Sequence, residues 1–291
     1  MTSQRPRVML LISPSSYRGE AFSRAARRLE LEALPVFDLP DEMEAHRSYR
    51  ESLDFRNIPG AVDWIAAHHA ERPLTAVLSV DDSATQLAAV ASERLGLPSN
   101  DPRAAEAARD KFVMRSMLSA AGVKCPAYRI VRPDDDFDEI AASINYPAVV
   151  KPRRLSGSRG VIRTDDEQEL RAALQRVTAI LQSEAEPDPT ILIEDYLPGV
   201  EVAVEGVVAD GEVQILAIFD KPDPLEGPFF EETIYVTPSR LPTVVQQRIG
   251  DETSAAAAAL GLRNGPIHAE LRIHDERAWL LEIAGRSIGG L

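Results

Sequence analysis

The sequence predicts an α/β protein, with a Rossmann-like parallel α/β domain first and antiparallel hairpins later. In the N-terminal part, three short apolar runs alternate with three segments of helical periodicity. The runs cover residues 7–12, 34–39 and 75–80, and the helical segments cover residues 20–31, 59–69 and 83–95. Such alternation indicates a parallel sheet with crossover helices. Farther along, Asp210-Gly211 separates two alternating runs, a pattern typical of a tight β-hairpin.

The end of the first predicted strand lacks the glycine fingerprint of dinucleotide-binding folds, so we do not predict NAD binding there. Asp81 and Asp82 follow the strand at residues 75–80. Parallel sheets place ligands beyond the carboxyl ends of their strands, so these aspartates are candidates for a binding site. The alternative for Asp82 is a cap for the following helix.

A long helix is predicted to begin at Pro102, because Asp101 offers a cap and proline suits the first turn. It should carry Lys111, run to about Ala121 and end at Gly122. Beyond it, strands are expected at residues 127–131, 148–151, 191–194, 201–208 and 212–219, and helices at residues 136–144, 165–182 and 243–260.

Two alternating runs near the end of the sequence, residues 265–273 and 279–286, predict a second hairpin. One register places six apolar side chains on the same face, by pairing Ala269 with Ile283, Leu271 with Leu281 and Ile273 with Trp279. That register sets Glu270 opposite Glu282 on the other face. Two facing carboxylates repel each other, and a shared cation such as Mg²⁺ relieves this. The alternative is a solvated sheet face that tolerates both glutamates.

The charge balance is acidic, with 46 acidic and 32 basic residues and a net charge of −14. This argues against nucleic acid or an anionic membrane as the main partner, although a local basic pocket remains open. Cys125 is the one cysteine, so no intrachain disulfide can form and a reducing compartment is expected. The apolar run at residues 8–12 is too short for a signal peptide or a membrane span. We therefore expect a cytoplasmic protein.

Lys151 ends a predicted strand, and a loop of small residues follows it. The loop comprises Ser156, Gly157, Ser158, Arg159 and Gly160. Small residues allow backbone N–H groups to approach an anion closely, and the lysine supplies a fixed charge. We predict a phosphate cradle here, with a plain turn as the alternative. Lys111, taken alone, indicates only a solvated lysine.

Together, these segments resemble the ATP-grasp superfamily over about residues 100–291. The resemblance rests on an ordered series of motifs: Ala108-Arg-Asp-Lys111, Val149-Val-Lys-Pro152, the loop at residues 156–160, Glu194-Asp-Tyr-Leu197, Pro198-Gly-Val-Glu201, and the Glu270/Glu282 pair with Arg286. The segments at residues 265–270 and 282–290 are most similar to the branch of dipeptide-forming L-amino-acid ligases and carnosine synthase.

The resemblance implies a role for each matching residue. Lys111 and Lys151 would contact ATP phosphates, with the loop at residues 156–160 folded over them. Glu194, Asp195, Tyr196 and Leu197 would form the hinge beside adenine, and Glu201 would accept hydrogen bonds from the ribose. Glu270 and Glu282 would hold Mg²⁺ or Mn²⁺, and Arg286 would stabilise the acyl phosphate or position the acyl substrate. His268 projects on the same face as Glu270, so it is a catalytic candidate beside Arg286 and Lys151, with a packed histidine as the alternative.

The implied function is an ATP-dependent carboxylate–amine ligase that forms an acyl phosphate and releases ADP. Its partners would be a small-molecule carboxylate and an amine, and a homodimer fits the family. The expected parts are an N-terminal Rossmann-like domain at residues 1–98, a linking helix at 99–127, a small ATP-grasp lobe at 128–196 and a large lobe at 197–291. Two alternatives are a biotin-carboxylase-like activity and a nucleotide-binding module without turnover.

The sequence departs from the family pattern in two places. Many members carry asparagine as a further metal ligand two residues after the second glutamate, where this chain has Ala284. Family chains usually continue well beyond the glycine pair at residues 289–290, so this sequence is short at the C-terminus. We expect the segment around Arg286 to be loosely held, so that the chain binds Mg-ATP but ligates slowly.

Overall fold

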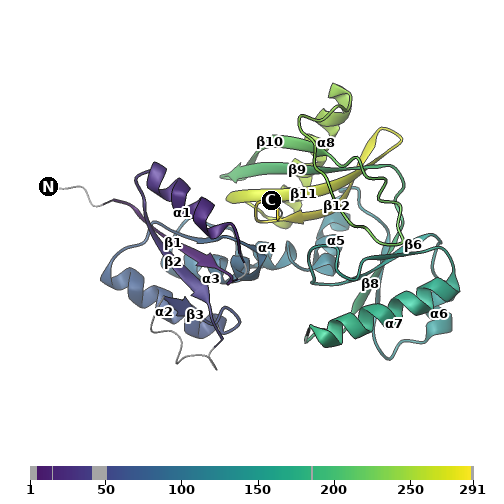
Figure 1. The fold of residues 1–291 in the computed structure, drawn as a ribbon, viewed down its shortest axis with the longest axis horizontal. Helices are drawn as coiled ribbons and strands as arrows, with labels where there is room; N and C mark the ends of the chain where they lie inside the picture. The colour runs from purple at the N-terminus through teal and green to yellow at the C-terminus, as the bar shows by residue number, and fades with distance from the viewer. Residues whose placement is uncertain (1–4, 15, 41–50, 185, 290–291) are drawn as a thin grey trace.

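The computed structural model describes residues 5–14, 16–40, 51–184 and 186–289. These residues form three four-stranded sheets, one parallel and two antiparallel. Figure 1 shows the parallel sheet in purple and blue at the left, and the green-to-yellow sheet at the upper right above the teal one. The predicted α/β class, with antiparallel sheets in the later part, is confirmed.

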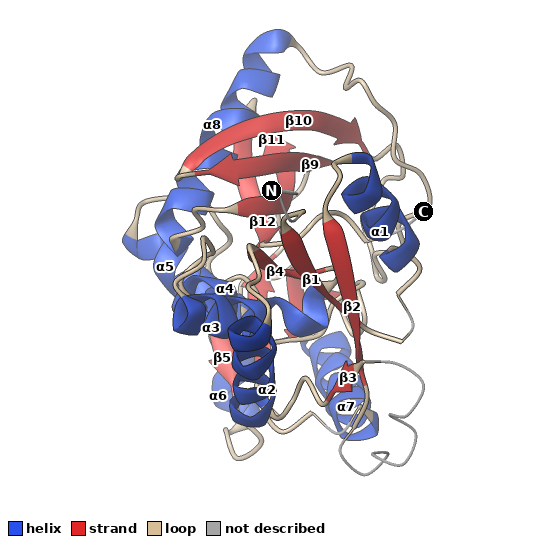
Figure 2. Cartoon of the chain, turned by 90° about the vertical axis from the view of Figure 1, so that its left-hand side faces the viewer, coloured by secondary structure: helices blue, strands red, loops and turns tan. Residues whose placement is uncertain are grey.

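The N-terminal sheet has the strand order β3-β2-β1-β4. Its strands are β1 (Arg7–Ile12), β2 (Glu32–Asp38), β3 (Ser52–Leu53) and β4 (Ala76–Ser79), and its helices are α1 (Gly19–Arg28), α2 (Ile58–Glu71) and α3 (Thr85–Leu95). Helix α1 covers one face and α2 and α3 cover the other, as Figure 2 shows. The short β3 was not predicted, because two residues carry no periodicity.

The second sheet has the order β5-β8-β6-β7 and is covered by two helices. Its elements are β5 (Tyr128–Val131), α6 (Phe137–Ala142), β6 (Ala148–Pro152), β7 (Ile162–Thr164), α7 (Glu167–Ser183) and β8 (Ile191–Asp195). The third sheet has the order β10-β9-β11-β12, and helix α8 packs against it. Its elements are β9 (Val200–Ala209), β10 (Glu212–Asp220), α8 (Thr243–Leu260), β11 (Gly265–His274) and β12 (Arg277–Ala284).

The helix predicted from Pro102 to about Ala121 is wrong, because two helices occupy this segment. They are α4 (Pro102–Ala107) and α5 (Lys111–Ala120). Asp110 separates them: its carboxylate accepts the N–H groups of Phe112 and Val113 and so caps α5. The second helix therefore begins at Lys111. Its first turn lies beside the end of β6, because the Lys111 N–H donates to the carbonyl of Arg153.

The predicted register of the last hairpin is correct at the end far from the turn and wrong near the turn. Ala269 pairs with Ile283 and Glu270 with Glu282, as predicted, but a β-bulge follows. Leu271 consequently pairs with Leu280 rather than Leu281, and Ile273 pairs with Ala278 rather than Trp279. Leu280 and Ala278 are the buried residues. The bulge is stabilised from outside the sheet, because Arg115 donates to the carbonyl of Leu281 at 2.5 Å.

Gly199 occupies a position that no other residue can fill without displacing backbone. It has φ of +107°, and a Cβ placed on it would lie 2.0 Å from the carbonyl oxygen of Ile273. We expect Gly199→Ala to lower the free energy of unfolding by about 2–4 kcal/mol, measured by urea titration. Gly122→Ala is the matched control, because Gly122 has φ of +75° with no atom within 4 Å and should lose only about 1–2 kcal/mol. Equal losses would show that the contact with Ile273 does not matter.

Candidate functional site

Strands β9 and β11 place a row of polar side chains on the sheet face that lies opposite the hydrophobic core. The register pairs Glu201 with Arg272 and Glu205 with His268, and it sets Glu270 against the small Ala203. Their neighbours in both strands, including Val202, Val204, Ala269 and Leu271, belong to the core. The alternation that buries one face therefore collects the charged residues on the other.

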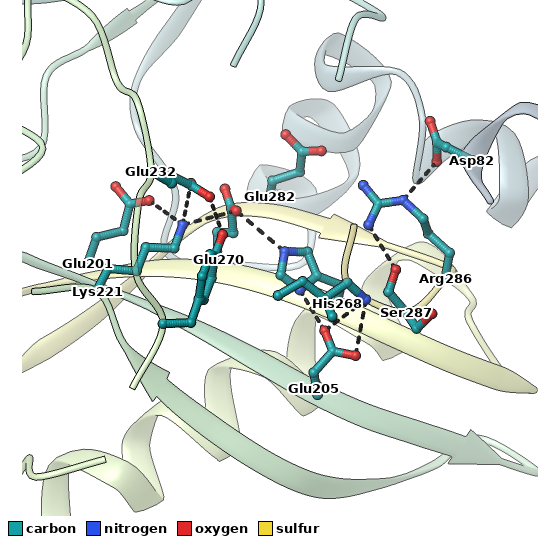
Figure 3. A network of polar contacts seen from close by, with 12 residues as sticks. Asp82, Glu201, Glu205, Lys221, Glu232, His268, Glu270, Glu282, Arg286 and Ser287 are labelled. Carbon is teal, nitrogen blue, oxygen red and sulfur yellow. Dashed lines mark hydrogen bonds and ion pairs between the residues drawn. The ribbon is translucent and has the colours of Figure 1, made fainter. Parts of the chain in front are cut away.

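Lys221 lies at the centre of a group of three carboxylates, shown in Figure 3. Its Nζ is 2.8 Å from Glu201 Oε1, 2.5 Å from Glu232 Oε1 and 3.0 Å from Glu270 Oε1. Burial alone would lower the pKa of Lys221, but the three carboxylates, Glu270 foremost, raise it well above its ordinary value. Burial likewise opposes ionisation of Glu270, yet Lys221 and His268 hold the pKa of this carboxyl well below its usual range. Both groups are therefore charged at neutral pH.

Glu201 is engaged on both of its oxygens. Oε1 contacts Lys221, and Oε2 accepts a hydrogen bond from Arg272 Nε at 3.0 Å. The same guanidinium donates to the carbonyl of Leu197 at 2.7 Å and to that of Leu225. Arg272 therefore pairs with Glu201, and it ties the hinge at residues 194–197 to β11.

His268 bridges two carboxylates. Its Nδ1 lies 2.7 Å from Glu205 Oε1, and its Nε2 lies 3.4 Å from Glu270 Oε1. Burial would lower the pKa of this imidazole, but the hydrogen bonds to Glu205 and Glu270 outweigh it and raise the pKa to about 9. A protonated ring donates from both nitrogens, so His268 links the sheet's polar residues to Glu270.

The predicted metal ligands Glu270 and Glu282 face each other across the ladder. Their side chains are 23% and 27% exposed, so both can be reached from solvent. Each carboxylate lies beside a lysine, since Glu282 Oε2 is 3.5 Å from Lys111 Nζ and Glu270 contacts Lys221. Two facing carboxylates with reachable oxygens fit Mg²⁺, which completes its shell with phosphate oxygens and water. Glu201, Glu232 and Glu270 also lie close enough to hold an ion, but the ammonium of Lys221 already fills that space.

Glu194 is buried between two cations. Its Oε1 is 2.8 Å from Arg115 Nε, and its Oε2 is 2.6 Å from Lys151 Nζ. Burial lowers the pKa of Lys151, and the nearby charge of Arg115 lowers it further. Glu194 raises this pKa but does not offset the effect of burial. Burial opposes ionisation of Glu194, but Arg115 and Lys151 lower the pKa of its carboxyl. One carboxylate thus compensates two cations, and a net positive charge remains at the end of β6.

Lys111 joins the loop of small residues to the carboxylate pair. Its Nζ donates to the carbonyl of Leu155 at 2.8 Å, directly before that loop, and lies 3.5 Å from Glu282. Within the loop, Gly157, Ser158 and Gly160 all have positive φ. The Val161 N–H donates to the Ser158 carbonyl, which closes a tight turn between β6 and β7. Lys111 is 6% exposed and is therefore not a solvated lysine.

The predicted hinge leads from β8 into β9. The N–H groups of Asp195 and Tyr196 donate to backbone carbonyls at 3.0 Å, and the Leu197 carbonyl accepts from Arg272. A hollow of about 460 Å³ lies beside this segment. It is lined by Tyr196, Pro198, Gly199, Glu201, Lys221 and neighbouring residues of the loop after β10. Its size falls within the range of small-molecule sites.

Arg286 contacts side chains and backbone of the fold, contrary to the expectation of a loosely held segment. Its Nε lies 3.5 Å from Asp82 Oδ1 and its guanidinium donates to the Ser287 carbonyl at 3.1 Å, as Figure 3 shows. The side chain of Arg286 is 13% exposed. Asp82 does not cap helix α3, whose N-cap residue is Ala84. The glycine pair at residues 289–290 lies partly outside the described residues.

Sequence reasoning missed Glu205, Lys221, Glu232 and Arg115, and it named Asp82 as a candidate without its partner Arg286. Glu205 could have been found, because it shares with Glu201 the polar face of a strand whose other face is apolar. Lys221 directly follows β10, but Glu232 lies in a loop that has no periodicity. The partners of Arg115 and Asp82 are distant in the sequence, so no local pattern indicates either pairing.

Comparisons with known proteins agree with this geometry. Residues 144–291 match the ATP-grasp domain, and residues 24–99 match the ATP-grasp N-terminal domain. Alanine–anticapsin ligase of Bacillus subtilis is 34% identical over 219 residues, which is 69% of this chain and 46% of that ligase. A D-alanine–D-alanine ligase of Aromatoleum aromaticum is 31% identical over 179 residues, covering 60% of this chain and 55% of that protein. The chain thus spans about half the length of these relatives.

A solved structure also resembles the whole chain. The crystal structure of an L-amino acid ligase from Bacillus licheniformis superposes with a TM-score of 0.79 and 27% identity. The match covers 99% of this chain and 68% of that protein. Among the described residues, none of the helices combines the length and the apolar character that crossing a bilayer requires. The matched domain covers more than half of the sequence, so the chain belongs to the ATP-grasp family.

Proposed function

We propose that the protein is part or all of an ATP-dependent carboxylate–amine ligase that forms an acyl phosphate. The observation that carries this proposal is the position of Lys111. Its ammonium lies between the loop of small residues and the carboxylate of Glu282, where the phosphates of a nucleotide and a shared metal ion would meet. The uncompensated positive charge at Lys151 and Arg115 adds a second reason for an anion to bind there.

In the proposed reaction, a substrate carboxylate oxygen attacks the γ-phosphorus of ATP and the bond to the β-phosphate oxygen breaks. ADP leaves, and an amine then attacks the acyl carbon and releases inorganic phosphate. Lys111 and Lys151 would neutralise phosphate oxygens, and Arg286 would face the acyl phosphate. Glu270 and Glu282 would hold Mg²⁺ or Mn²⁺, which would supply positive charge against the phosphates.

The remaining predicted residues have proposed roles around the nucleotide. Residues 156–160 would cover the phosphates, and Glu194 would hold Lys151 in place. The backbone of Asp195, Tyr196 and Leu197 would face adenine beside the hollow. Glu201 would meet the ribose, and His268 would orient Glu270. These roles correspond to a small lobe at residues 128–196 and a large lobe at 197–291, preceded by an N-terminal domain at 1–98 and a linker at 99–127.

Amino acids are the proposed substrates, because the similar proteins are an alanine–anticapsin ligase, a D-alanine–D-alanine ligase and an L-amino acid ligase. A nucleic-acid partner does not fit the net charge of −14.

The experiment is a screen of amino-acid pairs with ATP and Mg²⁺, with nucleotides separated by chromatography. We expect ADP and inorganic phosphate in equal amounts, and only when a carboxylate and an amine are both present. Lys151→Met is the matched inactive variant, and it should also weaken ATP binding by at least about tenfold in calorimetry. AMP formed in step with product would reject acyl-phosphate chemistry, and unchanged ATP affinity in Lys151→Met would reject the phosphate site.

A further inference from the structure

Residues 285–289, which carry Arg286, follow β12 and belong to no strand or helix. Side chains from two other parts of the molecule hold this segment. One set comes from the N-terminal parallel sheet and its helices, and the other comes from β9. A guanidinium outside the ladders depends on such contacts for its orientation.

Arg18 provides the most extensive contact from the N-terminal sheet. It lies directly before helix α1, and its Nη1 donates to the carbonyls of Ser287 at 3.0 Å and Ile288 at 2.9 Å. It also lies 3.4 Å from the Ser287 hydroxyl. Two successive carbonyls on one guanidinium fix the local backbone direction, because the donor fork is planar and rigid.

Asp82 contacts the Arg286 side chain itself. It lies in the short 3₁₀ helix η2 (Asp82–Ala84) after β4, and Oδ1 is 3.5 Å from Arg286 Nε. The other carboxylate oxygen lies 3.8 Å from Arg109 Nε. Asp82 therefore sits between two arginines, with Arg109 orienting it from the segment between α4 and α5.

Glu205 anchors the same segment to the polar face of the third sheet. Its two oxygens accept the Ile288 N–H at 3.1 and 3.2 Å, and Oε1 also contacts His268. Because His268 reaches Glu270, the segment is joined to the carboxylate pair through hydrogen bonds. The position of Arg286 thus depends both on the N-terminal sheet and on the sheet that carries Glu270.

We propose that Arg18 and Asp82 are positioning residues that hold Arg286 for the reaction. The N-terminal sheet then contributes to catalysis through an arginine that belongs to another part of the molecule. This inference rests on the proposed function for its catalytic part, whereas the docking of residues 285–288 on Arg18 does not. A displacement of about 1 Å in a group that faces the reacting atoms can cost about 100-fold in rate.

The first experiment measures amide hydrogen exchange without nucleotide or substrate. In Arg18→Ala, the peptide containing Arg286, Ser287 and Ile288 should exchange about tenfold faster than in the wild type, since the Ile288 amide loses its fixed direction toward Glu205. Arg18→Lys should retain part of the protection. Arg24→Ala is the matched control on helix α1, because Arg24 is exposed and pairs with Glu20 of the same helix. Equal exchange in all variants would overturn the proposal.

The second experiment measures ADP formation with the amino-acid pair that is most active in the screen. Arg18→Ala and Asp82→Asn should each lower kcat by about 10- to 100-fold and leave the KM for ATP within about twofold. In the Arg286→Lys background the same changes should have a smaller effect, because they act through Arg286. Fully additive losses, or an unchanged kcat despite faster exchange, would overturn the positioning role. A wild type that forms no ADP with any pair would reject the proposed function, and the exchange result would still decide the docking.

Discussion

Replacing Glu282 by glutamine is expected to lower magnesium-dependent ADP formation by about 100-fold or more while the fold stays intact. Its carboxylate faces Glu270 across the ladder, so its charge is the feature that a shared cation requires. Its side chain is 27% exposed and lies 3.5 Å from Lys111, so losing this ion pair should change the free energy of unfolding by less than about 1 kcal/mol. ADP formation at several Mg²⁺ concentrations and a urea titration measure the two effects.

Glu276→Gln is the matched control in the same hairpin. Glu276 lies in the turn and pairs with the half-exposed Arg248, away from the polar face of the sheet. This variant should turn over at the wild-type rate. Higher Mg²⁺ should restore part of the rate in Glu282→Gln, because one carboxylate is still present. Wild-type turnover of Glu282→Gln at low Mg²⁺ would reject the metal role of this pair.

The pairing of Glu270 with Glu282 could be predicted because strand periodicity is a strong constraint. A shift of one residue would move Ala269 and Ile283 from the core to solvent, and only one register avoids this. The same reasoning correctly predicted the parallel sheet, since buried strands that alternate with helices allow few other arrangements. The motifs identified Lys111 and Lys151 as phosphate-binding candidates. They could not predict that Lys111 would lie beside Glu282 or that Lys151 would lie beside Glu194.

The bulge near Leu281 could not be predicted, because its cause lies in another element. Alternation alone favours pairing Leu271 with Leu281. In the structure, Arg115 on α5 instead donates a hydrogen bond to the Leu281 carbonyl. The break between α4 and α5 has a similar origin. Asp110 caps α5 and also pairs with Arg153 beyond β6, so a tertiary contact decides where the helix begins.

The site residues that sequence reasoning missed share one property, which is that their partners are distant in the chain. Lys221 acquires its role from carboxylates on β9, β11 and a loop, and no spacing in the sequence encodes that meeting point. The ion pair between Arg286 and Asp82 was missed for the same reason. Asp82 follows a strand of the N-terminal sheet. The local composition of residues 285–289 predicted a flexible segment because it gave no sign of this tertiary contact.

Glu194→Gln is expected to lower the free energy of unfolding by about 3–5 kcal/mol. The carboxylate is 2% exposed and compensates Arg115, which is fully buried, and Lys151. Removing its charge leaves both cations without a counter-charge in a region of low polarity. Urea titration followed by tryptophan fluorescence measures the loss. Glu184→Gln is the matched control, because the pair of Glu184 with Arg159 is exposed and should be worth less than about 1 kcal/mol.

The pH dependence and a double substitution separate this charge effect from a loss of packing. The pKa of Glu194 is lowered from its ordinary value of 4.5, so its stabilising effect is complete above about pH 4.5 and is lost as the pH falls through the folded-state value. The difference between wild type and Glu194→Gln should therefore shrink on acidification. Adding Lys151→Met to Glu194→Gln removes one of the two uncompensated cations and should recover part of the lost stability. A loss that is independent of pH and unchanged by Lys151→Met would show that Glu194 acts through its shape, because neither result is compatible with a carboxylate that holds two buried cations together.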